Sequence, residues 1–123
     1  MAKFYLILGS INAMLLVIIG AFGAHGLKAK LTVENMAIYQ TAVQYHFYHA
    51  VGLILVGLIA YQIPASPYLR WSAWLMLMGI VLFSGSLYAL SITNIRWLGM
   101  ITPFGGMAFI LAWLFLTVGI IKS

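Results

Sequence analysis

The sequence predicts an all-α protein: an integral membrane bundle of four transmembrane helices, forming a single domain over residues 1–123. Hydrophobic residues make up 65% of the chain and charged residues only 6%, which leaves a water-soluble fold too little polar surface to cover itself. The mean hydropathy of +1.11 agrees with lipid as the surrounding medium. The apolar residues also fall into long runs separated by short polar turns, the pattern of a multi-pass membrane protein.

The first apolar run extends from Phe4 to Ala24 and predicts a helix over residues 4–25. At about 1.5 Å per residue, such a run crosses a hydrocarbon layer of about 30 Å. A secretory signal peptide is the competing interpretation, because Lys3 precedes the run and small residues end it. The run is long for the apolar part of such a signal, which favours a spanning helix.

The second helix is predicted over residues 33–61 and has two unlike halves. Thr32 is placed to cap it, and Glu34 lies in its first turn, where the helix dipole favours an anion. Residues 34–49 mix polar and aromatic side chains, whereas residues 50–60 are wholly apolar and too few to cross a bilayer alone. Part of the polar half must therefore lie inside the membrane or along its surface.

The third and fourth helices are predicted over residues 67–91 and 102–121. Ser66 and Thr102 each stand directly before a proline, and a hydroxyl residue followed by proline is typical of a helix start. With four crossings, both ends of the chain lie on the same side of the membrane.

The six cations of the chain lie scattered at the ends of these segments, which favours contacts with lipid head groups and argues against a nucleic-acid partner. Three are expected on the side of the termini and three on the other, so the positive-inside rule gives no orientation. They are Lys3, Arg70 and Lys122 on the first side and Lys28, Lys30 and Arg96 on the second.

Four blocks of the sequence together resemble one known family. They are GAFGAHGL at residues 20–27, YQTAVQYH at 39–46, FSGSLY at 83–88, and LG, ITP and GG between residues 98 and 106. With these blocks the chain resembles the small bacterial membrane proteins of domain-of-unknown-function family 423, which is related to the eukaryotic transmembrane protein 256 family. The resemblance implies a four-helix, multi-pass protein of the bacterial plasma (inner) membrane, and it implies no catalytic or binding residue.

Polar side chains of the first two helices form a candidate intramembrane face. Hydrocarbon would strand the amide of Asn12 unless it turns toward another helix. Counting depth along two antiparallel neighbours predicts that it bonds to His49, with Tyr45 or Tyr48 as the next choices. The candidate face consists of Asn12, Gln40, Gln44, Tyr45, His46, Tyr48 and His49.

The same residues argue against a metal site, a cofactor or an enzyme. His46 and His49 are spaced so that two imidazoles can share a metal. Cysteine is absent, however, and the only carboxylate side chain, Glu34, lies about 18 Å away from His46 along the helix. A haem between two histidines would need a second copy of the chain, because both lie on one helix. We therefore expect no metal, no cofactor and no enzymatic activity.

Two functional hypotheses remain. The first is a non-enzymatic integral membrane protein that acts through contacts with lipid, with other membrane proteins or with itself, in membrane integrity or organisation. The alternative is a small transporter or ligand-binding membrane protein that uses the polar face of the second helix. A continuous polar cavity reaching that face would favour the alternative, and a bundle closed by side chains would favour the first.

Overall fold

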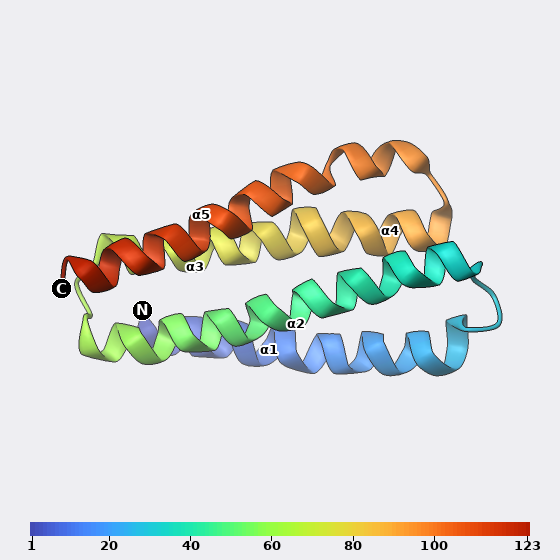
Figure 1. Cartoon of the computed structure of the whole chain (residues 1–123). Helices are drawn as coiled ribbons and strands as arrows, with labels where there is room; N and C mark the ends of the chain where they lie inside the picture. The colour runs from blue at the N-terminus through green and yellow to red at the C-terminus, as the bar shows by residue number, and fades with distance from the viewer.

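The computed structural model describes all 123 residues and contains four helices long and apolar enough to cross a membrane (Figure 1). The first span consists of α1 (Ala2–Phe22) and a wider π-helical turn, η1 (Gly23–Leu27). The second is α2 (Val33–Gln62). The third comprises α3 (Pro67–Gly79), a second π-helical turn η2 (Ile80–Ser84), and α4 (Gly85–Thr93). The fourth begins with a 3₁₀ turn, η3 (Arg96–Met100), and continues as α5 (Thr102–Ile121).

The helix starts follow the predicted capping signals in two cases and depart from them in the third. The hydroxyls of Thr32 and Ser66 accept hydrogen bonds from the backbone N–H groups of Asn35, at 3.0 Å, and Leu69, at 3.4 Å. Thr102 was expected to cap the fourth helix, but it is the first residue of α5 and makes no cap. The helical turn η3 directly precedes α5, so the Thr102 hydroxyl is not needed as a cap. It lies 2.6 Å from the Ser86 hydroxyl instead.

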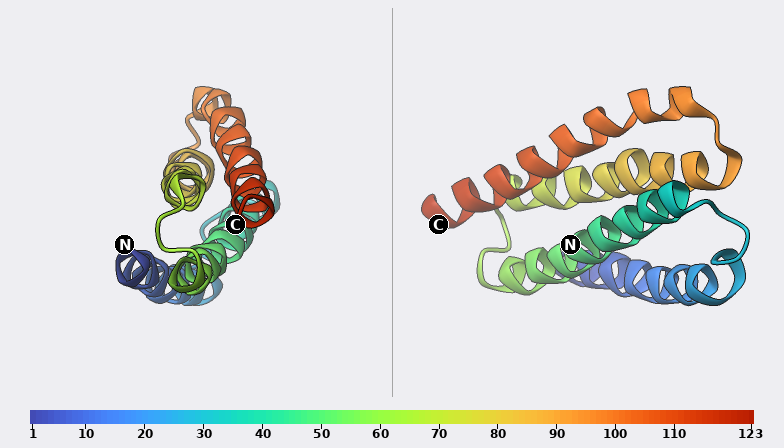
Figure 2. Two further views of the ribbon diagram at one scale, coloured as in Figure 1. Left: turned by 90° about the vertical axis from the view of Figure 1, so that its left-hand side faces the viewer. Right: turned by 45° about the vertical axis from the view of Figure 1, so that its right-hand side comes forward.

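The spans form two helical hairpins. α1 lies along α2, α5 lies along α3, and the hairpins meet where α2 packs against α3, η2 and α4. Toward its N-terminal end, α5 rises away from the α1–α2 hairpin (Figures 1 and 2). Both termini lie at the same end of the bundle (Figure 1). The apolar core lies between the hairpins and includes Leu53, Val56, Met76 and Phe109.

The path of α5 across η2 depends on one glycine. A Cβ atom placed on Gly105 would lie 2.3 Å from the backbone nitrogen of Phe83, which belongs to η2. The same atom on Gly106 would lie 3.8 Å from the Phe83 ring, an ordinary contact distance. The two backbones therefore approach each other at Gly105 more closely than any other residue type permits.

We predict that Gly105→Ala destabilises the bundle by about 1–3 kcal/mol, because a methyl group there must push the η2 backbone away. Gly106→Ala is the matched control and should be neutral or slightly stabilising, since alanine favours a helix over glycine. Thermal unfolding of the two variants in the same detergent measures the difference. Equal stability of the two variants would show that α5 does not cross η2 at this point.

Candidate functional site

A chain of hydrogen bonds through His46 joins three spans inside the bundle. The Nδ1 atom of His46 lies 2.9 Å from the Tyr88 hydroxyl on α4, and its Nε2 atom lies 3.0 Å from the Asn12 side-chain oxygen on α1. The Asn12 amide nitrogen in turn donates to the backbone carbonyl of Leu8 at 2.8 Å. Asn12 and His46 are both buried, with 8% and 3% of their surfaces exposed. One imidazole thus ties α1, α2 and α4 together.

These contacts fix where the proton of His46 resides. The Leu8 carbonyl can only accept, so it must face the Asn12 nitrogen, and the Asn12 oxygen must face His46. That oxygen accepts from Nε2–H, which leaves Nδ1 of the neutral ring to accept the proton of the Tyr88 hydroxyl. His46 is therefore protonated on Nε2.

His49 is held in the opposite tautomer. Its Nδ1 atom lies 2.7 Å from the backbone carbonyl of Tyr45 and must donate to it. Its Nε2 atom accepts from the Trp113 indole N–H of α5 at 3.0 Å. The ring also stacks on Phe109 of α5, with centroids 3.4 Å apart. Gly79 makes room for this stack, because a Cβ there would lie 2.3 Å from the Phe109 ring.

The structure divides the predicted polar face into two groups. Asn12, His46 and His49 are buried and bonded between helices. The other four residues lie on the exposed surface of α2: Gln40, Gln44, Tyr45 and Tyr48. The predicted face is therefore no single surface, because its members lie on different sides of α2.

Asn12 bonds to α2 as predicted, but its partner is His46 and the prediction of His49 is wrong. The row of α2 that faces α1 includes Tyr39, Val43 and Ala50, which Gly23, Gly20 and Gly9 contact. His46 continues this row at helical spacing, whereas His49 is displaced by about 60° toward α5. Depth along the helix favours His49, and direction around α2 decides for His46.

The sequence does not predict two partners of the histidines, Tyr88 and Trp113. Depth counting does not find Tyr88, since it lies much nearer the end of its helix than His46 does. The two meet because side chains lean toward the N-terminus of their own helix, and α2 and α4 run in opposite directions. Trp113 gives no sequence signal of its own in a span already rich in apolar and aromatic residues.

A groove of about 720 Å³ lies between the middle parts of α2 and α5. Because none of its lining residues belongs to the loops at the ends of the bundle, it opens at the side. The hydrogen-bonded pair of His49 and Trp113 lines it, as do Phe83 of η2 and Phe109 of α5. Nine of its eleven lining residues are hydrophobic. In a membrane this groove faces lipid, because it opens sideways between two spans.

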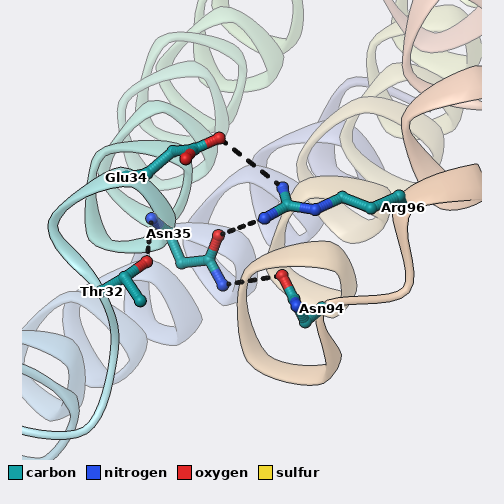
Figure 3. A network of polar contacts seen from close by, with 5 residues as sticks. All are labelled: Thr32, Glu34, Asn35, Asn94 and Arg96. Carbon is teal, nitrogen blue, oxygen red and sulfur yellow. Dashed lines mark hydrogen bonds and ion pairs between the residues drawn. The ribbon is translucent and has the colours of Figure 1, made fainter.

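A second polar cluster closes one end of the bundle (Figure 3). The Asn35 amide lies between Asn94, whose oxygen accepts at 3.2 Å, and Arg96, which donates to the Asn35 oxygen at 3.4 Å. Arg96 also lies 3.9 Å from Glu34, and both of these side chains are exposed. Asn94 adopts a left-handed conformation, with φ of 61°, at the end of α4. The cluster joins the start of α2 to the turn between α4 and η3.

The buried polar groups are bonded to other groups of the protein. All four ring nitrogens of His46 and His49 are engaged with protein groups. No buried side-chain nitrogen or oxygen lacks a hydrogen-bond partner, and no three histidine or carboxylate side chains gather where they would hold a metal ion. The arrangement of these polar groups cross-links the helices.

Comparison with known proteins identifies relatives along the whole chain. The family model "Protein of unknown function (DUF423)" matches residues 19–106. The UPF0382 membrane protein YwdK of Bacillus subtilis is 50% identical over 120 residues, which are 98% of each chain. The UPF0382 membrane protein SERP0230 of Staphylococcus epidermidis is 48% identical, covering 98% of this chain and 97% of its own. No solved structure matches.

We predict that Asn12→Leu lowers stability by about 1–3 kcal/mol, because it strands the Nε2–H group of His46. Ser10→Leu is the control, since Ser10 is exposed and bonds only within its own helix, to Leu6. In the double variant Asn12→Leu, His46→Phe neither polar group remains, so its loss should be smaller than the sum of the two single losses. Unfolding in detergent by chemical denaturant measures all four variants. Strict additivity would show that the two side chains are not coupled.

Proposed function

The chain belongs to the DUF423 family of bacterial multi-pass membrane proteins, and on that premise we propose that it acts without enzymatic chemistry, through contacts made sideways inside the bilayer. The contact site of this proposal is the groove between α2 and α5, and its occupant is a lipid acyl chain. Through such contacts the protein would organise the lipid around it and so serve membrane integrity. The single observation that carries the proposal is the lateral, apolar opening of the groove.

The interior of the bundle favours a protein that acts through contacts at its surface over one that transports a solute through its middle. The polar groups of α2 that face inward bond to neighbouring helices and leave none of their buried atoms unpaired. The groove that reaches His49 is lined mostly by apolar and aromatic side chains. A transporter of polar solutes requires polar groups along a hydrated path. In this bundle the inward-facing polar groups are bonded to protein groups instead.

The lining of the groove suits a hydrocarbon chain. Its volume of about 720 Å³ falls within the range of small-molecule sites. Aromatic rings at Tyr45, Phe83, Phe109 and Trp113 give it rigid walls. The groove is open to the surrounding bilayer. An acyl chain can therefore enter it from the side and stay in contact with apolar groups throughout.

We predict that the protein purified from membranes retains phospholipid and that Gly106→Leu releases most of it. Gly106 lines the groove and its Cβ direction is open beyond Phe83, so a leucine there projects into the space of the acyl chain. Native mass spectrometry from mild detergent measures the fraction of lipid-bound chains, and lipid extraction identifies the species.

Ala21→Leu provides the matched control. Ala21 is exposed near the end of α1 that adjoins η1, so a leucine at this position lies outside the groove. Lipid retained equally by the two variants would refute the groove as the lipid site. Retention of a co-purifying membrane protein that both variants keep would place the contact on another face.

A further inference from the structure

The outer face of α2 carries a row of exposed polar side chains, the last of which, Tyr48, also borders the groove. Gln40, Gln44 and Tyr48 follow each other at four-residue spacing, so they lie on one side of the helix, and all three are exposed. The Gln44 amide nitrogen donates to the Tyr48 hydroxyl at 2.5 Å. We call these three residues the amide row.

The amide row reaches below the lipid head groups. Gln44 lies eleven residues after Val33, the first residue of α2, which is about 16 Å along the helix. The head-group layer on each side of a bilayer is only about 5–8 Å thick. Even a moderately tilted α2 therefore holds Gln44 several ångströms inside the hydrocarbon.

Groups of the amide row have no partner within the chain. The bond to Tyr48 uses one N–H of Gln44 and leaves its side-chain oxygen unengaged, and the Gln40 amide makes no side-chain hydrogen bond. Acyl chains offer neither donors nor acceptors, so such groups are costly in lipid. This contrasts with the inward-facing polar groups of the bundle, which are all bonded.

We propose that the amide row is the contact between two copies of this chain, related by a two-fold axis along the membrane normal. Copies inserted in the same orientation hold each residue at the same depth, so Gln44 of one copy meets Gln44 of the other. A primary amide carries both donors and an acceptor, which makes the row self-complementary, as a two-fold contact requires. A lipid tail at this depth lacks that complementarity.

The rest of the outer face continues the contact. Val51, Leu55 and Leu58 extend the same side of α2 toward its C-terminal end, and all are exposed. Val51 and Leu55, like Tyr48, also form the edge of the groove between α2 and α5. Apolar side chains at such spacing pack well between two near-parallel helices. The inference goes beyond the proposed function and can be tested separately from it, since Gln40 and Gln44 do not line the groove.

Cysteine cross-linking in membranes tests the contact directly, because the chain contains no cysteine. Gln44→Cys is expected to give a disulfide-linked dimer on mild oxidation. Ile18→Cys is the control: Ile18 is 58% exposed on α1, and it lies near the level of Gln44, because Gly20 faces Val43 across the two helices. Cross-linking at residue 18 equal to that at residue 44, or none at residue 44, would overturn the proposal.

A second experiment removes the amide. The fold should be kept, because Gln44 is exposed and its side chain hydrogen-bonds only to Tyr48 of its own helix. Gln44→Leu should raise the protein-to-lipid ratio needed for dimerisation by about tenfold, as expected for the loss of one or two interhelical hydrogen bonds. Energy transfer between labelled copies in vesicles measures this ratio, and Ser10→Leu, an exposed hydroxyl removed from α1, should leave it unchanged. A wild-type chain that stays monomeric at every ratio, with lipid covering the row, would contradict the inference.

Discussion

Hydrocarbon offers no hydrogen bonds, and this constraint decides where the polar side chains of the bundle lie and which helices they join. Every buried polar side-chain atom has a partner, and many of these partners belong to another span. The serines illustrate the rule: Ser84 donates to the Ala42 carbonyl on α2 at 2.8 Å, and Ser72 donates to the Ala112 carbonyl on α5 at 2.7 Å. In lipid, where apolar side chains gain little by leaving their surroundings, such bonds and close packing hold helices together.

Glycines make those bonds geometrically possible. Tyr39 reaches the Ile19 carbonyl of α1 at 2.5 Å only because Gly23 leaves space for its ring, where a Cβ would lie 2.2 Å away. Gly79 in the same way admits Phe109, on which His49 stacks. Each of these glycines lies where a large side chain of a neighbouring helix passes. Close packing and the polar bonds between helices therefore depend on the same small residues.

Hydropathy and capping were sufficient to predict the four spans, because the bilayer sets helix length and polar turns interrupt the apolar runs. They predicted that Asn12 turns to the second helix, because an amide without a hydrogen-bond partner is costly in lipid. They did not predict the choice of His46 over His49. That choice depends on direction around α2, because His46 faces α1 whereas His49 lies about 60° away, toward α5. The groove was not predicted either, because it depends on how α2, η2 and α5 are arranged in space and not on any local pattern.

Two histidines of α2, one turn apart, join this helix to the other spans, and each is held as a different tautomer of the neutral ring. Solid-state NMR of the protein in bilayers, with nitrogen-15 in the histidine rings, distinguishes these forms, and single substitutions of His25, His46 and His49 assign the signals. The predicted result is a neutral His46 that carries its proton on Nε2, facing Asn12, and a neutral His49 that carries it on Nδ1, facing the Tyr45 carbonyl. The same tautomer in both rings, or a ring with both nitrogens protonated, would contradict the hydrogen bonds by which α1, α4 and α5 are joined to α2.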